Sequence, residues 1–266
     1  MRCDTPLSRV SALALELFDL IVPPRCAGCG ARAYPMLCRE CEALIEYIQG
    51  PYCRRCGEPE PPAAHGWPLC EQCRERKRPA LDGARAVALH YGPLREAIIG
   101  FKFNGEHSLA RPLGQMLARR VLNERARPHH LPWEDFDALV PAALHTRRRR
   151  WRGFDQALLL CKEMARDLEK PVWADVLTRV KDTTPQIGLS PAQREENLHN
   201  AFRSGAPGKI AGKSLLLVDD VCTTGATLYE AARALKKAGA ETVYAITITR
   251  RVPSWHPESF PSLDRH

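Results

Sequence analysis

From residue 84 onwards, the apolar positions of the chain follow two alternating patterns. Short, nearly continuous apolar runs are typical of buried strands, and they occur at 84–91, 136–142, 214–221 and 242–249. Apolar residues spaced as on one helix face lie between these runs, within 109–121, 157–168 and 228–238. Gly239 follows the last helical pattern as a stop signal. Strands that alternate with helices predict an α/β fold, in which helices cover a mostly parallel sheet and ligands bind at the carboxyl ends of the strands.

A separate apolar stretch, residues 11–22, lies near the N-terminus. Leu13, Leu17, Leu20 and Ile21 share one helical face there, but the stretch is too short to span a bilayer. No small-residue cleavage site follows it, so we expect no signal peptide and no transmembrane segment. The pattern favours a helix packed on its own protein, and a helix that binds a membrane surface or a partner is the alternative.

Cysteine is the most informative residue type before position 80. The chain has 11 cysteines, and eight of them form four C-x-x-C pairs. Two such pairs supply the four thiolates of a tetrahedral structural zinc site, and this usage indicates a reducing compartment. We therefore predict up to two structural Zn2+ ions, with pairs grouped in sequence order and crossed grouping as the alternative. The expected ligands are Cys26, Cys29, Cys38, Cys41, Cys53, Cys56, Cys70 and Cys73.

The end of the cysteine pairs marks a change in organisation. Residues 74–83 are charged and contain Pro79 and Gly83, which is typical of a linker. We therefore expect two domains, residues 1–80 and residues 81–266. The net charge of +8 favours anionic partners: phosphates, nucleotides, nucleic acids or a membrane surface.

Two carboxylates end the predicted strand at 214–221. We expect the strand to end at Val218, with Asp219 and Asp220 at its carboxyl end, a turn at 223–225 and a helix that Thr227 opens. Backbone N–H groups at a helix N-terminus bind anions, and small residues in the turn let a phosphate come close. Carboxylates beside that site can accept hydrogen bonds from sugar hydroxyls or help to hold Mg2+. The pattern predicts a site for a phosphorylated sugar.

The stretch VDDVCTTGAT, residues 218–227, resembles the phosphoribosyl diphosphate (PRPP) binding motif of type I phosphoribosyltransferases. The resemblance implies that Asp219 and Asp220 bind the ribose hydroxyls and are the catalytic carboxylates, with Mg2+ bound together with PRPP. It also implies a loop that binds the 5′-phosphate, formed by Cys222, Thr223, Thr224, Gly225, Ala226 and Thr227.

A basic segment follows the predicted strand at 136–142. Residues 147–152 read RRRRWR and precede Gly153. This segment is expected at the same end of the sheet as the phosphate loop, where arginines can hold a diphosphate through bidentate contacts. Arg147 and Arg152 are the candidates for that contact, and solvent-exposed surface charge is the simpler alternative for each arginine.

The order of the motifs resembles the ComF (competence protein F) family of phosphoribosyltransferase-like proteins. The shared order is the cysteine pairs, then RGFDQA at 152–157, then TTPQIGLSPAQREENLHNAF at 183–202, then the PRPP motif. The resemblance implies a double zinc ribbon followed by a phosphoribosyltransferase-type, Rossmann-like domain with helices on both faces of a mostly parallel sheet. Lys102 matches an early lysine of the family and joins the expected PRPP ligands, whereas Asp155 replaces the family's usual Asn.

Two functional hypotheses of different classes follow. In the first, the chain is a phosphoribosyltransferase of nucleoside metabolism, and Thr184, Gln186, Arg194 and Asn197 match a segment that resembles the flexible active-site loop of those transferases. In the second, a non-catalytic module binds single-stranded DNA through charge and aromatic stacking at 147–152. The resemblance also implies a cytoplasmic protein of DNA uptake in natural transformation, with a DNA-translocating ATPase as partner and the inner membrane face as an alternative location.

Overall fold

The computed structural model describes most of the chain. The described residues are 25–32, 36–61, 68–75, 80–126, 131, 135–142, 153–181, 198–251, 253, 254 and 256, without the side chain of residue 125. The expected N-terminal helix at 11–22 and the basic residues 147–152 lie outside them, as does most of the segment 183–202. The paired cysteines and the carboxylates predicted to bind a sugar phosphate lie within them.

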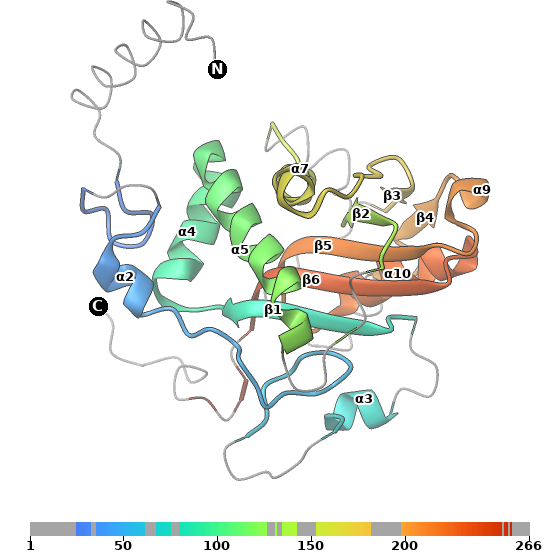
Figure 1. The fold of residues 1–266 in the computed structure, drawn as a ribbon, viewed down its shortest axis with the longest axis horizontal. Coiled ribbons are helices and arrows are strands. Elements are labelled where there is room, and N and C mark those ends of the chain that lie inside the picture. The colour runs from blue at the N-terminus through green and yellow to red at the C-terminus, as the bar shows by residue number, and fades with distance from the viewer. Residues whose placement is uncertain are drawn as a thin grey trace, which may run out of the picture.

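Helices and strands alternate as the hydrophobic pattern predicts (Figure 1). Every predicted strand and helix from residue 84 onwards is confirmed, with ends shifted by one or two residues except for the strand expected to end at Val218. In chain order the elements are α2 (Arg39–Ala43), α3 (Glu71–Glu75), β1 (Gly83–Leu89), α4 (Gly92–Phe103), η1 (His107–Leu109), α5 (Ala110–Leu122), η2 (Glu124–Ala126), β2 (Ala138–Pro141), α7 (Gln156–Leu168), β3 (Leu177–Arg179), β4 (Phe202–Ser204), α9 (Pro207–Ile210), β5 (Ser214–Cys222), α10 (Ala226–Lys237) and β6 (Thr242–Arg250). None of the described helices is long and apolar enough to cross a membrane.

Four parallel strands form the main sheet in the order β1-β6-β5-β2. In the register of the two central strands, Leu216 of β5 lies opposite Tyr244 of β6. β3 and β4 form a separate antiparallel pair. Because the four strands of the main sheet run in the same direction, their carboxyl ends meet at one edge, which is where α/β folds place their ligands.

Helices cover both faces of the main sheet (Figure 1). Leu216 and Val218 pack into one core with residues of α4, α5 and α7, whereas Leu215 and Leu217 pack into a second core with α10. Successive side chains of a strand point to opposite faces, so β5 contributes to both cores. A strand buried on both faces needs a continuous apolar sequence rather than an alternating one, and this is the pattern that predicted β5.

The cysteine-rich segment packs against the outer edge of β1. Tyr47 forms an antiparallel bridge with Ala88 of β1, and the N–H of Ile48 donates to the carbonyl of Val87 at 2.9 Å. Ile48 and Tyr52 are buried against β1 in a small apolar cluster. The segment before the second cysteine group therefore adds an isolated β-bridge at the outer edge of β1, which holds this segment against the sheet.

Three sequence-based expectations need correction. The strand does not end at Val218: β5 runs to Cys222 because its neighbour β6 continues to Arg250 and keeps pairing with it. The expected linker at 74–83 is in part helical, since α3 ends at Glu75. Residues 92–103, for which no element was predicted, form α4, whose buried Leu94, Ala97, Ile98 and Phe101 lie at helical spacing.

Candidate functional site

Asp219 and Asp220 lie near the end of β5, at the carboxyl edge of the sheet. Pairing between β2 and β5 ends with Pro141 opposite Val218, one residue before Asp219. On the other side, Asp219 lies opposite Thr247 of β6. The two carboxylates therefore stand where β5 passes the end of one neighbour while it remains paired to the other.

Lys102, in the last turn of α4, reaches Asp220 from a distant part of the chain. Its Nζ lies 2.7 Å from Oδ1 of Asp220, and the two side chains are only 19% and 11% exposed. This ion pair offsets the charge of one carboxylate, which reduces the cost of holding two acidic groups side by side in a partly buried place. The fold thus brings together Lys102 and Asp220, which the sequence analysis assigned to the same site.

The second carboxylate, Asp219, has an unusual pKa. Burial and the negative charge of Asp220 raise the pKa of Asp219 and Lys102 opposes them, which leaves the pKa at about 7. The backbone N–H of Asp220 donates to Oδ1 of Asp219 at 2.9 Å, which also favours the ionised form. Asp219 therefore changes charge near neutral pH, which is typical of carboxylates that take part in binding or catalysis.

His90 belongs to the same polar cluster, although the sequence analysis does not select it. It follows β1 at the carboxyl edge, and its Nδ1 lies 2.8 Å from Oγ1 of Thr249 on β6. Burial and the charge of Lys102 lower the pKa of His90 and Asp220 opposes them, which leaves the pKa at about 4, so the ring is neutral at pH 7. The sequence signal that could have selected His90 was its position at the end of a predicted strand, because polar residues there face the edge of the sheet where ligands bind.

The chain turns from β5 into α10 through residues 223–225. Gly225 has a φ of 77°, in the left-handed region that a side chain disfavours, and it caps the start of α10. Oγ1 of Thr224 accepts a hydrogen bond from the N–H of Ala226 at 3.4 Å. The helix begins at Ala226, one residue before the expected Thr227, and its positive N-terminal end lies at the edge that holds the carboxylates.

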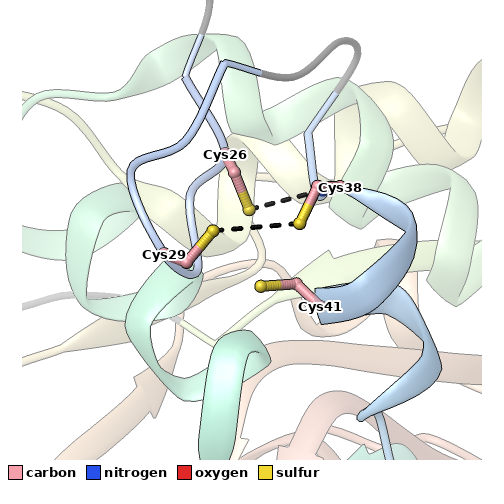
Figure 2. A group of neighbouring side chains, drawn as sticks. All are labelled: Cys26, Cys29, Cys38 and Cys41. Carbon is pink, nitrogen blue, oxygen red and sulfur yellow. Dashed lines mark hydrogen bonds between the residues drawn. The ribbon is translucent and has the colours of Figure 1, made fainter.

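The eight paired cysteines form two groups of four in sequence order. The first group is Cys26, Cys29, Cys38 and Cys41 (Figure 2), and the second is Cys53, Cys56, Cys70 and Cys73. In each group the Sγ atoms lie within 4.8 Å of one another. The expected sequential grouping is therefore the observed one, and crossed grouping is not.

The spacing of the sulfur atoms fits a zinc ion. Four thiolates at about 2.3 Å from a tetrahedral Zn2+ lie about 3.8 Å apart. The Sγ atoms of Cys29 and Cys38 are 3.8 Å apart, and those of Cys56 and Cys70 are 3.6 Å apart. The N–H groups of Gly28 and Cys38 also donate to Sγ of Cys26, at 3.4 and 3.3 Å, as backbone groups do around a metal-bound thiolate.

Several predicted site residues cannot be placed against this geometry. Arg147, Arg152 and the segment 183–197 lie outside the described residues. Asp155 is described, and its side chain caps α7 by accepting the N–H of Leu158 at 3.1 Å. Asn and Asp cap helices about equally well, so the replacement of the family's Asn by Asp155 retains this local role.

Comparisons with known protein families match both parts of the structure. Residues 17–79 match the family described as Double zinc ribbon domain. Residues 155–263 match the family described as Phosphoribosyl transferase domain. This matched range includes β5, the loop at 223–225 and α10. These matches cover the cysteine groups and the carboxylate edge respectively.

Similar whole proteins extend this result along the chain. The chain is 33% identical to Competence protein F of Haemophilus influenzae over 216 residues, which are 80% of this chain and 90% of that protein. The chain belongs to the ComF family. Another relative in the family, DNA utilization protein YhgH of Escherichia coli strain K12, is 35% identical over 199 residues, or 74% of this chain and 83% of that protein.

Solved structures similar to this ComF-family chain are more distant. Orotate phosphoribosyltransferase from Aeropyrum pernix is 18% identical and covers 63% of this chain and 70% of its own, with a TM-score of 0.32. The assignment of a phosphoribosyltransferase-type fold therefore rests on the parallel sheet, its helices on both faces and the domain match.

Proposed function

We propose that the chain binds Mg-PRPP, or a related phosphorylated sugar, at the carboxyl edge of its sheet. The observation that carries this proposal is the adjacency of Asp219 and Asp220 on β5 to the N-terminus of α10, with Lys102 paired to Asp220 at 2.7 Å. Carboxylates for sugar hydroxyls and a helix N-terminus for a phosphate then lie on one short stretch of chain. Residues 222–227 hold the 5′-phosphate in this proposal.

The two carboxylates have different tasks in the proposed complex. Lys102 already offsets the charge of Asp220, so Asp219 is the group with more to gain from a partner. A ribose hydroxyl that donates to Asp219, or a Mg2+ ion near it, favours the ionised carboxylate and lowers its pKa from about 7. The bound Mg2+ supplies positive charge that offsets the diphosphate of PRPP.

Phosphoribosyl transfer is the reaction that this site suits. The bond between the anomeric carbon and the diphosphate breaks, the diphosphate leaves with the bonding electrons, and a nitrogen nucleophile forms the new bond. Positive charge develops on the ribose during this step, and the carboxylates of Asp219 and Asp220 stabilise it. Arg147 and Arg152 are proposed to contact the diphosphate, and no acceptor can be assigned from the described residues.

Each cysteine group is proposed to hold one structural Zn2+. Four thiolates fill a tetrahedral ion completely, which leaves no position for a substrate. The folding of a segment this short then depends on the metal.

A second candidate function is the binding of single-stranded DNA, because relatives are named for competence and for DNA utilization. Arg147 to Arg152 would contact the backbone, and the chain would act in the cytoplasm during DNA uptake, beside a DNA-translocating ATPase. Binding that uses phosphate contacts weakens steeply as salt rises. Fluorescence anisotropy with labelled oligothymidine at increasing salt tests this candidate, and affinity that is insensitive to salt would contradict it.

The test of the main proposal is calorimetric titration of Mg-PRPP into the parent chain and the double variant Asp219→Asn/Asp220→Asn. The matched control is Asp175→Asn, which makes the same substitution at an exposed carboxylate that pairs with Lys209 at 3.0 Å. We expect the parent and the control to bind equally and the double variant to lose at least tenfold in affinity. A parent that does not bind Mg-PRPP would refute the proposal and favour DNA as the ligand.

A further inference from the structure

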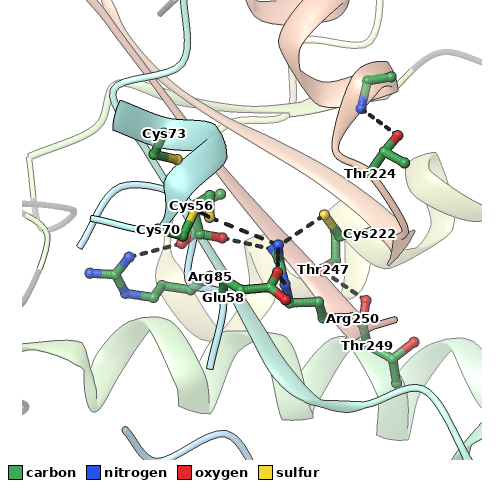
Figure 3. A network of polar contacts seen from close by, with 12 residues as sticks. Cys56, Glu58, Cys70, Cys73, Arg85, Cys222, Thr224, Thr247, Thr249 and Arg250 are labelled. Atoms are coloured by element: carbon green, nitrogen blue, oxygen red, sulfur yellow. Dashed lines mark hydrogen bonds and ion pairs between the residues drawn. The ribbon is translucent and has the colours of Figure 1, made fainter. Parts of the chain in front are cut away.

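The second cysteine group lies next to the phosphate loop, residues 222–227, across a small cavity. Figure 3 shows the side chain of Arg250, at the end of β6, between this group and Cys222. The Arg250 guanidinium donates to the carbonyl of Cys56 at 2.9 Å, and it lies 3.8 Å from Sγ of Cys56 and 3.6 Å from Sγ of Cys222. One buried side chain therefore joins the cysteine group to the first residue of the phosphate loop.

A second contact joins the same group to α10. Oη of Tyr229 lies 3.8 Å from Sγ of Cys73. The ring of Tyr229 in turn packs on the loop, since a Cβ added to Gly225 would lie 3.3 Å from the ring. Tyr229 thus touches the cysteine group with its hydroxyl and the turn of the loop with its ring.

The contacts of Arg250 and Tyr229 reach sulfur atoms that a bound metal would hold in place. All four cysteines of the second group are buried, and their Sγ atoms lie within 4.8 Å of one another. Arg250 is anchored on its other side by Glu58, which accepts from its Nε at 2.7 Å. Loss of the metal would release the sulfur atoms of Cys56 and Cys73 from their tetrahedral arrangement, so that they leave the positions that Arg250 and Tyr229 contact.

The packing between the two parts is close. The cavity between them measures about 10 Å³, room for one water at most, and its lining includes Cys56 and Cys73 together with Thr224, Gly225 and Tyr229. On the side of the cysteine group, a Cβ added to Gly57 would lie 2.7 Å from the carbonyl of Ala84. A shift of Cys56 or Cys73 therefore acts directly on Arg250 and Tyr229, which also contact Cys222 and Gly225.

The first cysteine group provides the contrast. It packs on α4, where a Cβ added to Gly28 would lie 2.6 Å from Cβ of Pro93. Among the contacts of the described residues, none joins its four cysteines to residues 222–229. The two groups have similar ligand geometry and different neighbours, so they can be compared within one chain.

From these contacts we infer that metal binding at the second cysteine group, Cys53, Cys56, Cys70 and Cys73, sets the conformation of the phosphate loop at residues 222–227. Arg250 and Tyr229 are the positioning residues that transmit it. The inference rests on the proposed function for the identity of the loop's ligand, a sugar phosphate. By linkage, a ligand bound in the loop then raises the affinity of this group for its metal by the same factor as the metal raises the affinity of the loop for the ligand.

Hydrogen exchange of the full-length, zinc-loaded chain tests the inference without any ligand. Cys70→Ser removes a ligand of the second group, and Cys29→Ser is the matched control in the first. We expect the amides of residues 223–229 to exchange at least tenfold faster in Cys70→Ser and within twofold of the parent in Cys29→Ser. Unchanged exchange in Cys70→Ser, or an equal increase in both variants, would overturn the inference.

Milder variants test the positioning role of Tyr229 and Arg250 without removing a metal ligand of the second cysteine group. Tyr229→Phe removes only the hydroxyl that meets Cys73, and Arg250→Lys keeps the charge but loses the fork of donors. With zinc content unchanged, both are expected to speed exchange at 223–229 by at least threefold, whereas Arg251→Lys, at the adjacent exposed arginine, leaves it unchanged. Parent-like exchange in both Tyr229→Phe and Arg250→Lys would show that these residues do not transmit the effect, and would overturn their assignment.

The linkage with the ligand is measured by the release of zinc to a chromogenic chelator. Saturating ribose 5-phosphate is expected to slow the release from the second group at least threefold in the parent and less in Tyr229→Phe, with release from the first group unchanged. Binding of Mg-PRPP without any effect on loop exchange or zinc release would overturn the inference and leave the proposed function intact. In the opposite case, the chain binds neither Mg-PRPP nor ribose 5-phosphate, while hydrogen exchange in the loop still responds to the metal. That result would support the coupling and refute the proposed function.

Discussion

Replacement of Asp219 by Asn should stabilise the ligand-free protein increasingly as the pH rises. Burial and the neighbouring Asp220 raise the pKa of Asp219 from 3.8 to about 7. Between these two values the folded protein keeps a proton that the unfolded chain has lost, so its stability falls as the pH rises towards 7. Above pH 7 the carboxylate is ionised in both states, and the folded protein bears the full cost of holding that charge.

The size of the effect follows from the pKa. From pH 5.5 up to the pKa of the folded carboxylate is an interval of about 1.5 pH units. At about 1.4 kcal/mol per unit, the free energy of unfolding of the parent falls by about 2 kcal/mol over that interval. Asp219 is only partly buried and shares its titration with Asp220, so we expect about 1–2 kcal/mol. Asn has almost the same shape and no charge, so its stability advantage over Asp should grow by this amount across the interval.

Urea unfolding of the zinc-loaded, ligand-free chain at pH 5.5, 6.5, 7.5 and 8 measures this difference. Asp175→Asn is the matched control, because Lys209 lowers the pKa of that exposed carboxylate and it does not titrate in the interval. A constant difference in free energy of unfolding between Asp219→Asn and the parent would refute the assigned pKa. Greater stability together with weaker binding of Mg-PRPP would identify Asp219 as a residue kept for function at the expense of stability.

Two further predictions concern buried charges. Glu124 accepts from Arg85 at 2.9 Å and pairs with Arg120, and the three side chains are 1–3% exposed. Glu124→Gln removes the buried carboxylate that both guanidinium groups contact, and it should reduce the free energy of unfolding by about 3–5 kcal/mol in urea unfolding. A loss below about 1 kcal/mol would contradict the burial of the cluster. Lys102→Met removes a charge that lowers the pKa of Asp219, so the pH dependence of stability assigned to Asp219 should move to higher pH. Thermal unfolding measured across pH 6–9 tests this. A pH dependence with the same midpoint as in the parent would argue against the contact of Lys102 with this carboxylate pair.

The strands and helices of the α/β part could be predicted because their signals are local. An apolar run such as 214–221 can be buried on both faces only as a central strand, and the helical spacing of α10 followed by Gly239 marks a helix and its end. The end of β5 could not be predicted, because it depends on how far β6 continues beside it. α4 was not predicted, although its buried Leu94, Ala97, Ile98 and Phe101 follow the spacing of one helix face, so the local signal was present there.

The candidate site divides in the same way. Asp219, Asp220 and the Gly225 turn lie on one stretch of chain, so the sequence alone indicated them and their chemistry. His90 carries no motif, and only the parallel register of β1, β6 and β5 places it beside Thr249 and the charged pair. Lys102 was selected by family resemblance, and its ion pair with Asp220 depends on how α4 packs on the sheet.

By itself, the sequence determined most of the elements, the four C-x-x-C pairs and the acidic pair before a helix N-terminus, because each depends on residues close together in the chain. The tertiary structure alone decided which cysteines share a group, which charge faces Asp220 and how Arg250 and Tyr229 join the second group to the phosphate loop. Those contacts are set by strand register and by the packing of helices on the sheet, and residue spacing along the chain carries no information about either.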